Sequence, residues 1–156
     1  MRITKKGKEN LETELRALKE KRLQISQAIG DARNLGDLRE NSEYHAAREA
    51  QALNEAKIRQ LEDKLARAVL IDETKLPDDI VVILSHVKLR DLDSGDIEEY
   101  TLVGEGQSDP LNGKILVTSP LAQGLLGHKK GNRVSLEVPA GKLNYEILEI
   151  SKSTDV

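Results

Sequence analysis

Apolar residues recur in the first part of the chain in steps that alternate between four and three residues. The first run consists of Leu11, Leu15, Leu18, Ile25, Ile29 and Ala32, with Arg22 where another apolar residue is expected. The second run consists of Tyr44, Ala47, Gln51, Asn54, Ile58, Leu61, Leu65 and Ala68. This spacing places a stripe of side chains on one face of a helix and is typical of a coiled-coil seam. The pattern therefore predicts two long helices, with Thr4 as a plausible N-cap of the first.

The stretch between the two runs predicts a tight reversal of the chain. Gly36 is a helix stop, and Asp37 with Glu40 has the spacing of a capping box that starts the second helix. A connection this short forces the helices to run antiparallel. The expected seam layers are Leu11–Leu65, Leu15–Leu61, Leu18–Ile58, Arg22–Asn54, Ile25–Gln51, Ile29–Ala47 and Ala32–Tyr44. The layer of Arg22 and Asn54 is polar, and such a layer can fix the register of the helices.

The period changes to two after residues 71–79, which are rich in turn-forming residues. Alternating stretches predict strands over residues 80–84, 87–92, 99–103, 114–118, 133–138 and 143–150. A short helix is expected over residues 119–127, because Ser119 suits the N-cap, Pro120 the first helical position and Gly127 the position after the end. The predicted fold is α+β, with an antiparallel coiled-coil hairpin over residues 1–75 and an antiparallel sheet with one short helix over residues 76–156.

Composition supports an elongated helical part beside a small sheet domain. Charged residues make up 33% of the chain, Phe and Trp are absent, and there are three Tyr, so a large globular core is not expected. The absence of Cys excludes disulfides and thiolate metal sites. No run of about 18 apolar residues and no signal peptide is present, so we expect a soluble cytoplasmic protein with no membrane partner.

Charge does not by itself indicate nucleic-acid binding. The net charge of −3 divides into 16 basic against 14 acidic residues over positions 1–75, and 8 against 13 over positions 76–156. A strong nucleic-acid signature would be a domain with a pI above about 9.

The two carboxylates at the reversal, Asp37 and Glu40, are candidate metal ligands. Mg²⁺ takes about six oxygen ligands and is commonly held by one or two carboxylates together with phosphates and waters. Two carboxylates are too few to bind it tightly, so a partner must complete the shell and the reversal would act as a cofactor in trans. From the spacing alone, a plain capping box is the more common meaning of Asp-x-x-Glu. The two roles are compatible, because a cap holds the carboxylates rigidly.

The run of residues 36–49 resembles the tip signature of the Gre family of bacterial transcript-cleavage elongation factors. In the second part, Ser119-Pro120-Leu121-Ala122, Leu125-Leu126-Gly127, Gly131, Pro139 and Tyr145-Glu146-Ile147-Leu148 match the same family. The likeness covers nearly the whole chain. It implies that the coiled coil enters the secondary channel of bacterial RNA polymerase, while an FKBP-like second domain stays on the channel rim.

The resemblance also implies roles for single residues. Asp37 and Glu40 would help to hold a Mg²⁺ ion in the polymerase active site, where backtracked RNA is cut. Arg33 and Arg48 would match the basic patch that contacts the displaced RNA 3′ end, although a solvated helix face is the more common reading of these residues alone. The protein itself would be no enzyme: it would be a monomer that stimulates the polymerase and binds no cofactor when free.

The second domain is expected to dock on the polymerase. Asp109, Ser119, Pro120 and Leu121 form the expected contact, but Ser119 and Pro120 fit a plain helix start equally well. FKBP-like folds include prolyl isomerases with aromatic pockets; since this chain has no Phe or Trp, we predict no isomerase activity.

Two alternatives to cleavage stay open. One is a regulator that occupies the polymerase channel without promoting cleavage, and the other is a coiled-coil adaptor whose tip is only a helix cap. The Gly-Asp-Leu-Arg-Glu sequence at the tip favours cleavage. Near the tip, Tyr44 is expected to pack in the seam and His45 to be a surface residue.

Overall fold

The structure is a computed structural model that describes residues 1–36 and 41–153. Its contacts divide the chain into two compact units. The first unit is Met1 with Lys8–Val69, and the second is Arg2–Gly7 with Leu70–Val156. We expected a boundary after residue 75, whereas the contacts place it after Val69 and assign an N-terminal segment to the second unit.

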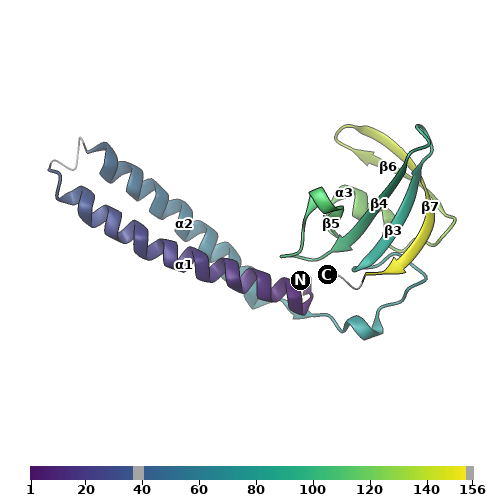
Figure 1. Cartoon of the computed structure of the whole chain (residues 1–156), viewed down its shortest axis with the longest axis horizontal. Coiled ribbons are helices and arrows are strands. Elements are labelled where there is room, and N and C mark those ends of the chain that lie inside the picture. Colours follow the sequence, from purple (N-terminus) through teal and green to yellow (C-terminus); the bar gives the residue numbers. More distant parts are fainter. Residues whose placement is uncertain (37–40, 154–156) are drawn as a thin grey trace. The chain divides into compact units, whose positions relative to one another are not determined.

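The first unit is a hairpin of two helices, α1 (Lys5–Arg33) and α2 (Ser42–Arg67), which lie side by side and antiparallel (Figure 1). The predicted hairpin is therefore confirmed. The buried positions follow the predicted seam and are Leu11, Ile25, Ile29, Ala32, Asn54, Ile58 and Leu61. Between and beside them, Leu15, Leu18, Tyr44, Ala47 and Leu65 are half-buried. The hairpin thus has a single apolar stripe with solvent on both flanks.

Of the predicted polar layer, Asn54 lies in the seam, whereas Arg22 is exposed at its edge. Arg22 pairs instead with Glu55, its Nε and Nη2 lying 2.7 and 3.0 Å from the two carboxylate oxygens. Asn54 enters the seam at 3% exposure and donates from Nδ2 to the carbonyl of Leu18 at 3.0 Å. A guanidinium is costly to remove from water, so the long charged side chain stays at the edge while the short amide is buried.

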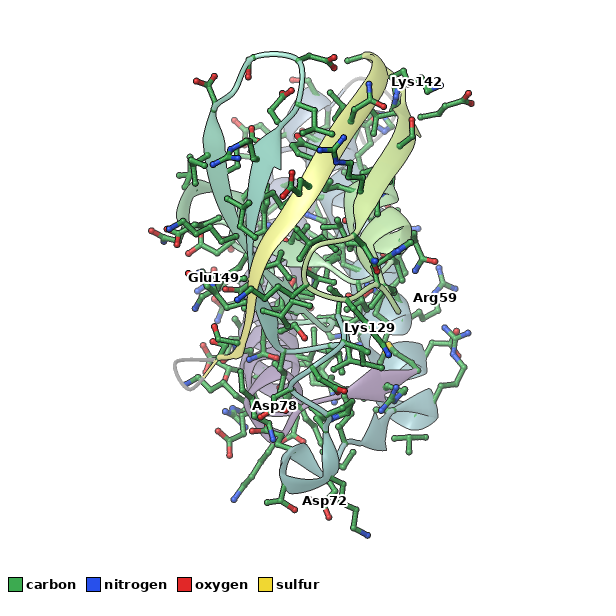
Figure 2. All side chains as sticks on the ribbon, turned by 90° about the vertical axis from the view of Figure 1, so that its right-hand side faces the viewer. Arg59, Asp72, Asp78, Lys129, Lys142 and Glu149 are labelled. Atoms are coloured by element: carbon green, nitrogen blue, oxygen red, sulfur yellow. The ribbon has the colours of Figure 1, made fainter. Side chains whose placement is uncertain are left out.

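The second unit contains a five-stranded sheet in the order β5-β4-β3-β7-β6. The strands are β3 (Ser85–Asp91), β4 (Ile97–Val103), β5 (Lys114–Leu116), β6 (Arg133–Val138) and β7 (Gly141–Lys152). A short helix, α3 (Pro120–Leu125), contacts β6. Side chains from the sheet and from α3 enclose a core in which Val87, Leu89, Leu102, Leu125 and Ile147 are fully buried. Polar side chains such as Lys142 and Glu149 project from β7 (Figure 2).

Two expectations for the sheet are wrong. Residues 80–84 form no strand: Ile80 makes one isolated bridge to Lys129, and Leu84 has a φ of 70° that interrupts extended backbone. Val81, Ile83 and Leu84 are buried there without forming a ladder. The sheet is also mixed, because β5 pairs parallel to the last part of β4, with Lys114 opposite Thr101 and Leu116 opposite Val103. The other predicted strands and the short helix are present.

The N-terminal segment is buried in the second unit. Ile3 and Thr4 are both 0% exposed, and the Thr4 hydroxyl donates to Gln107 Oε1 at 2.5 Å. Thr4 Oγ1 also accepts from the Gly7 amide at 3.0 Å, which is the predicted N-cap interaction. A Cβ on Gly7 would lie 2.5 Å from the carbonyl oxygen of Glu105, so glycine is required for this close approach. Hence α1 begins in the second unit and continues through the first.

Candidate functional site

The closed end of the hairpin begins where α1 stops. The amides of Asn34 and Leu35 each donate to a carbonyl three residues back, at 3.1 Å, which closes the last turn of α1. Gly36 follows with a φ of 124°, which only glycine adopts easily, so its predicted role as helix stop is confirmed. Asp37 and Glu40, the predicted metal ligands, lie outside the described residues, and their role stays a prediction.

The second helix begins later than the capping-box pattern predicts. Helix α2 starts at Ser42 and its N-cap is Asn41, whose Oδ1 accepts from the Tyr44 amide at 3.0 Å. The prediction of Asp37 as N-cap with Glu40 at the third helical position is therefore wrong. Asn caps a helix as well as Asp does, and Glu43 in the first turn adds a favourable charge. The sequence analysis considered only Asp37 for this position, and the structure places Asn41 there.

Asn41 also reaches the other helix. Its Nδ2 donates to the carbonyl oxygen of Ala32, in the last turn of α1, at 2.5 Å. Ala32 is 2% exposed and Asn41 is half-buried, so this hydrogen bond is partly shielded from water. One side chain thus joins the end of α1 to the start of α2. The sequence analysis missed this role, because a bond between residues nine positions apart is not visible in either helical pattern.

The two predicted RNA-contacting arginines both lie near the closed end of the hairpin. Arg33 is the last residue of α1 and is exposed, at a helix terminus that favours positive charge. Arg48 is exposed on α2, and its Nη1 donates to Gln51 Oε1 at 3.2 Å. A guanidinium in water can bind a phosphate in a forked geometry. The positions fit the predicted basic patch, whose contact with RNA stays a prediction.

Tyr44 and His45 follow the cap. Tyr44 is half-buried, in keeping with the expected packing role. Its ring stands edge-on to that of His45, with centroids 5.6 Å apart and planes at 66°. His45 is exposed, as expected of a surface residue.

The predicted docking residues lie at the two ends of β5. Asp109 exchanges backbone hydrogen bonds with Lys114, the first residue of the strand, at 2.9 and 3.0 Å. Ser119 donates its amide to Leu116, the last residue, at 2.9 Å, and its hydroxyl caps α3 by accepting from Ala122 at 3.3 Å. The plain helix-start role of Ser119 is therefore present, and docking stays a prediction.

The side chains around β5 differ in exposure. Pro120 is exposed, whereas Leu121 is half-buried and packs against the sheet core. Leu111, which the sequence analysis did not single out, is 97% exposed beside Asp109. Single exposed apolar side chains are common on protein surfaces, so this exposure does not by itself mark a contact surface.

The described residues contain neither a cluster of metal ligands nor a membrane-spanning helix. Over residues 1–36 and 41–153, no three His, Asp or Glu side chains converge in a way that could hold a metal ion. Within the same ranges, no helix combines the length and the apolar character needed to cross a membrane.

Comparison with known protein families shows to which family the chain belongs. Residues 1–70 match the model of the transcription elongation factor N-terminal domain, and residues 76–152 match that of the GreA/GreB C-terminal domain. The chain belongs to the GreA/GreB family of transcription elongation factors. The resemblance found in the tip sequence and around α3 is thereby confirmed for both parts of this GreA/GreB-family chain.

Individual relatives align over nearly all of their length. The chain is 48% identical over 150 residues to transcription elongation factor GreA of Chlorobium phaeobacteroides, covering 95% of this chain and 94% of the relative. It is 44% identical over 149 residues to GreA of Desulfovibrio desulfuricans, covering 96% and 92%. Among solved structures, the crystal structure of GreA factor homolog 1 (Gfh1) of Thermus thermophilus is 30% identical, covers 96% of this chain and 97% of its own, and has a TM-score of 0.46.

Proposed function

We propose that this GreA/GreB-family protein stimulates RNA polymerase to cut backtracked RNA, and that Asp37 and Glu40 act inside the polymerase active site. The observation that carries the proposal is the hairpin itself. Its helices of 29 and 26 residues form a thin arm of roughly 40 Å at about 1.5 Å per residue, with the acidic pair in the chain that joins them. An arm of this shape can deliver two carboxylates through a narrow channel.

The donor chemistry of Asp37 and Glu40 fits Mg²⁺. Carboxylate oxygens are hard ligands, and one or two of them commonly share the ion with substrate phosphates and waters. We propose that the polymerase supplies the remaining ligands, so that the free protein holds no cofactor and is not itself an enzyme. When bound, the ion lowers the pKa of a coordinated water and stabilises charge on the phosphate.

The remaining predicted residues have supporting roles in this proposal. Arg33 and Arg48 would hold the displaced RNA 3′ segment through phosphate contacts. Asp109, Ser119, Pro120 and Leu121 would dock the second unit outside the channel. The protein would act as a monomer and in the cytoplasm, where bacterial polymerase works.

The test uses a stalled, backtracked polymerase complex with end-labelled RNA and Mg²⁺. Wild-type protein is expected to shorten the RNA, and the Asp37→Asn/Glu40→Gln variant is expected to lose this activity. A matched control is Glu9→Gln/Glu12→Gln, which removes two carboxylates with the same spacing from the first part of α1. The control should cleave like the wild type.

Competition for the polymerase separates the alternatives. The Asp37→Asn/Glu40→Gln variant should still displace labelled wild-type protein, because the arm and the docking surface are intact. Binding by the wild type without any shortening would make the protein a channel regulator that does not cleave. Absence of binding would make it an adaptor with another partner. Equal cleavage by all variants would show that Asp37 and Glu40 are not the reactive groups.

A further inference from the structure

Half of the basic residues of the second unit are concentrated in one stretch of the chain. From residue 110 to residue 136 there is no Asp or Glu, and the stretch contains Lys114, Lys129, Lys130 and Arg133. The rest of positions 76–156 holds 4 basic and 13 acidic residues. Charge is therefore segregated within the unit, although its net charge is negative. We call residues 110–136 the acid-free stretch; it includes β5, α3 and the first part of β6.

Three of these cations lie in the turn that joins α3 to β6, which we call the basic turn (residues 128–133). The Lys129 amide donates to Asn132 Oδ1 at 2.7 Å, and the Asn132 amide donates back to the Lys129 carbonyl at 3.0 Å. The turn is also tied to β7, because the Gly131 amide donates to the Ile147 carbonyl at 2.7 Å and the Ile147 amide donates to the Asn132 carbonyl at 2.9 Å. The basic turn thus presents its side chains from a fixed backbone, which lowers the cost of ordering them on binding.

The charged side chains of the basic turn face water. Lys129 and Lys130 are exposed, and within residues 1–36 and 41–153 neither forms an ion pair. Arg133 Nε lies 3.9 Å from Glu146 Oε2, which is too long for a hydrogen bond, and the Arg133 side chain is 74% exposed. Asp79 lies next to the bridge partner of Lys129, but it is exposed and forms no ion pair in the described part of the chain. These cations therefore add little to the stability of the fold and are open to a partner.

We propose that the basic turn binds an acidic surface of RNA polymerase and so helps to dock the second unit. The inference rests on the proposed function and adds a contact to the docking surface. The predicted contact at Ser119 and Pro120 lies in the same acid-free stretch, at the other end of α3. A surface without carboxylates avoids the repulsion that an acidic partner would otherwise meet. The Arg133 guanidinium can bind a carboxylate in a forked geometry, while the two lysines speed association as point charges.

An acidic protein surface fits this charge distribution better than nucleic acid does. Double-stranded DNA carries a negative charge about every 1.7 Å along its axis, so it would extend past the basic turn and meet the acidic remainder of the unit. Glu146 lies opposite Arg133 in the sheet, and Glu137 follows in β6. An acidic patch of limited extent on a protein can contact the turn without facing these carboxylates.

Competition for RNA polymerase against labelled wild-type protein tests the proposal. Lys129→Glu/Lys130→Glu reverses two exposed charges and removes no buried contact. This variant should need about 10-fold more protein for half-displacement at about 0.1 M salt, and the difference should shrink at higher salt because the charges are screened. Its RNA cleavage at saturating protein should match the wild type, because the turn contributes to docking alone. Lys129→Arg/Lys130→Arg keeps both charges and should compete like the wild type.

A matched control is Lys75→Glu/Lys142→Glu, which makes the same charge change outside the acid-free stretch. The Lys75 side chain is 82% exposed. Lys142 is exposed at the turn between β6 and β7, at the other end of β6 from Lys129 (Figure 2). The control should displace the label like the wild type. Thermal unfolding of all three variants should stay near the wild-type value, so that a loss of docking is not a loss of fold.

The outcomes distinguish this inference from the proposed function. If Lys129→Glu/Lys130→Glu displaces the label as well as the control does, the basic turn is a solvated surface and the inference fails. If that variant loses binding to a short DNA duplex but competes normally for the polymerase, the partner is nucleic acid and the inference also fails. If the wild type binds the polymerase without cleaving RNA, the proposed function fails, while the competition still decides this inference. If the wild type does not bind the polymerase, both fail.

Discussion

In the helical unit the buried side chains form a single line, whereas in the sheet unit they close around a core. On the hairpin, Leu23 and Leu53 remain 69% and 66% exposed a short distance from the seam. In the sheet unit, Leu89 and Ile147 are 0% exposed and are covered from all sides. A single row of buried side chains makes a thin arm but gives little stabilisation per residue. A closed core gives more stabilisation per residue but does not extend far from its centre.

The difference explains why polar side chains matter more in the hairpin. At the closed end the seam includes the buried Ile29 and Ala32, and Asn41 adds hydrogen bonds to Tyr44 and to Ala32. Regions with few buried contacts open most readily. In the sheet unit, the pairing of the strands and the packing of α3 hold the elements in place, and local polar interactions contribute less.

A matched pair of Leu→Ala substitutions gives the largest expected effect. Leu89→Ala in the core of the sheet unit should cost about 3–5 kcal/mol of unfolding free energy, because the cavity is enclosed and cannot collapse fully. Leu61→Ala in the seam should cost about 2–3 kcal/mol, at the lower end of the range, because water and neighbouring side chains reach the site from the flanks. Denaturant unfolding, followed by helical circular dichroism and by the NMR signals of the sheet unit, measures both. Equal losses of unfolding free energy in the two variants would contradict the proposed difference between the seam of the hairpin and the core of the sheet unit.

A smaller effect is expected from the buried amide of the seam. Among the described residues, no group bonds Asn54 Oδ1, although that atom is buried. Asn54→Leu should raise the unfolding free energy by about 1 kcal/mol, because an unsatisfied buried polar atom is replaced by an apolar group of similar size. Thermal unfolding checks the sign.

The same variant tests whether the amide fixes the register of the hairpin. A polar seam residue can specify one alignment at some cost in stability. Asn54→Leu should therefore broaden the NMR signals of the neighbouring seam residues even as it stabilises the helices. A destabilised variant with sharp signals would show that the hydrogen bond to Leu18 outweighs the unsatisfied oxygen.

The smallest expected effect concerns the ion pair at the edge of the seam. The hydrogen bond from Arg22 holds the pKa of Glu55 below its ordinary value of 4.5. A carboxyl whose pKa is lower in the folded state stabilises the fold above its unfolded pKa, and this contribution is lost as the pH falls through the folded value. Glu55→Gln should therefore reduce hairpin stability slightly at pH 7, and this difference from the wild type should shrink as the pH falls below 4.5 through the folded pKa. Both groups are exposed, so a large loss at pH 7 would contradict the proposed weakness of the pair.

At the closed end of the hairpin, some features could be predicted from the sequence pattern and others could not. The helix stop at Gly36 was predictable, because it depends on local backbone conformation. The start of α2 was misplaced, because Asp and Asn are both good caps and the local sequence does not choose between them. The structure shows that Asn41 caps α2 and also bonds Ala32 of α1. The positions of Arg33 and Arg48 near the closed end follow from the sequence, while the hydrogen bond from Asn41 to Ala32 required the fold.

By itself, the sequence determined the elements whose signals are local: the two long helices, the capped helix α3, the hairpin of β6 and β7, and the tip that identifies the family. The tertiary structure alone decided the parallel pairing of β5 with β4, the absence of a strand at residues 80–84, and the burial of Ile3, Thr4 and Gly7 in the second unit. The physical reason is the range of the interactions. Helix periodicity and caps involve neighbours along the chain, whereas strand direction and polar partners are set by segments that meet only after folding.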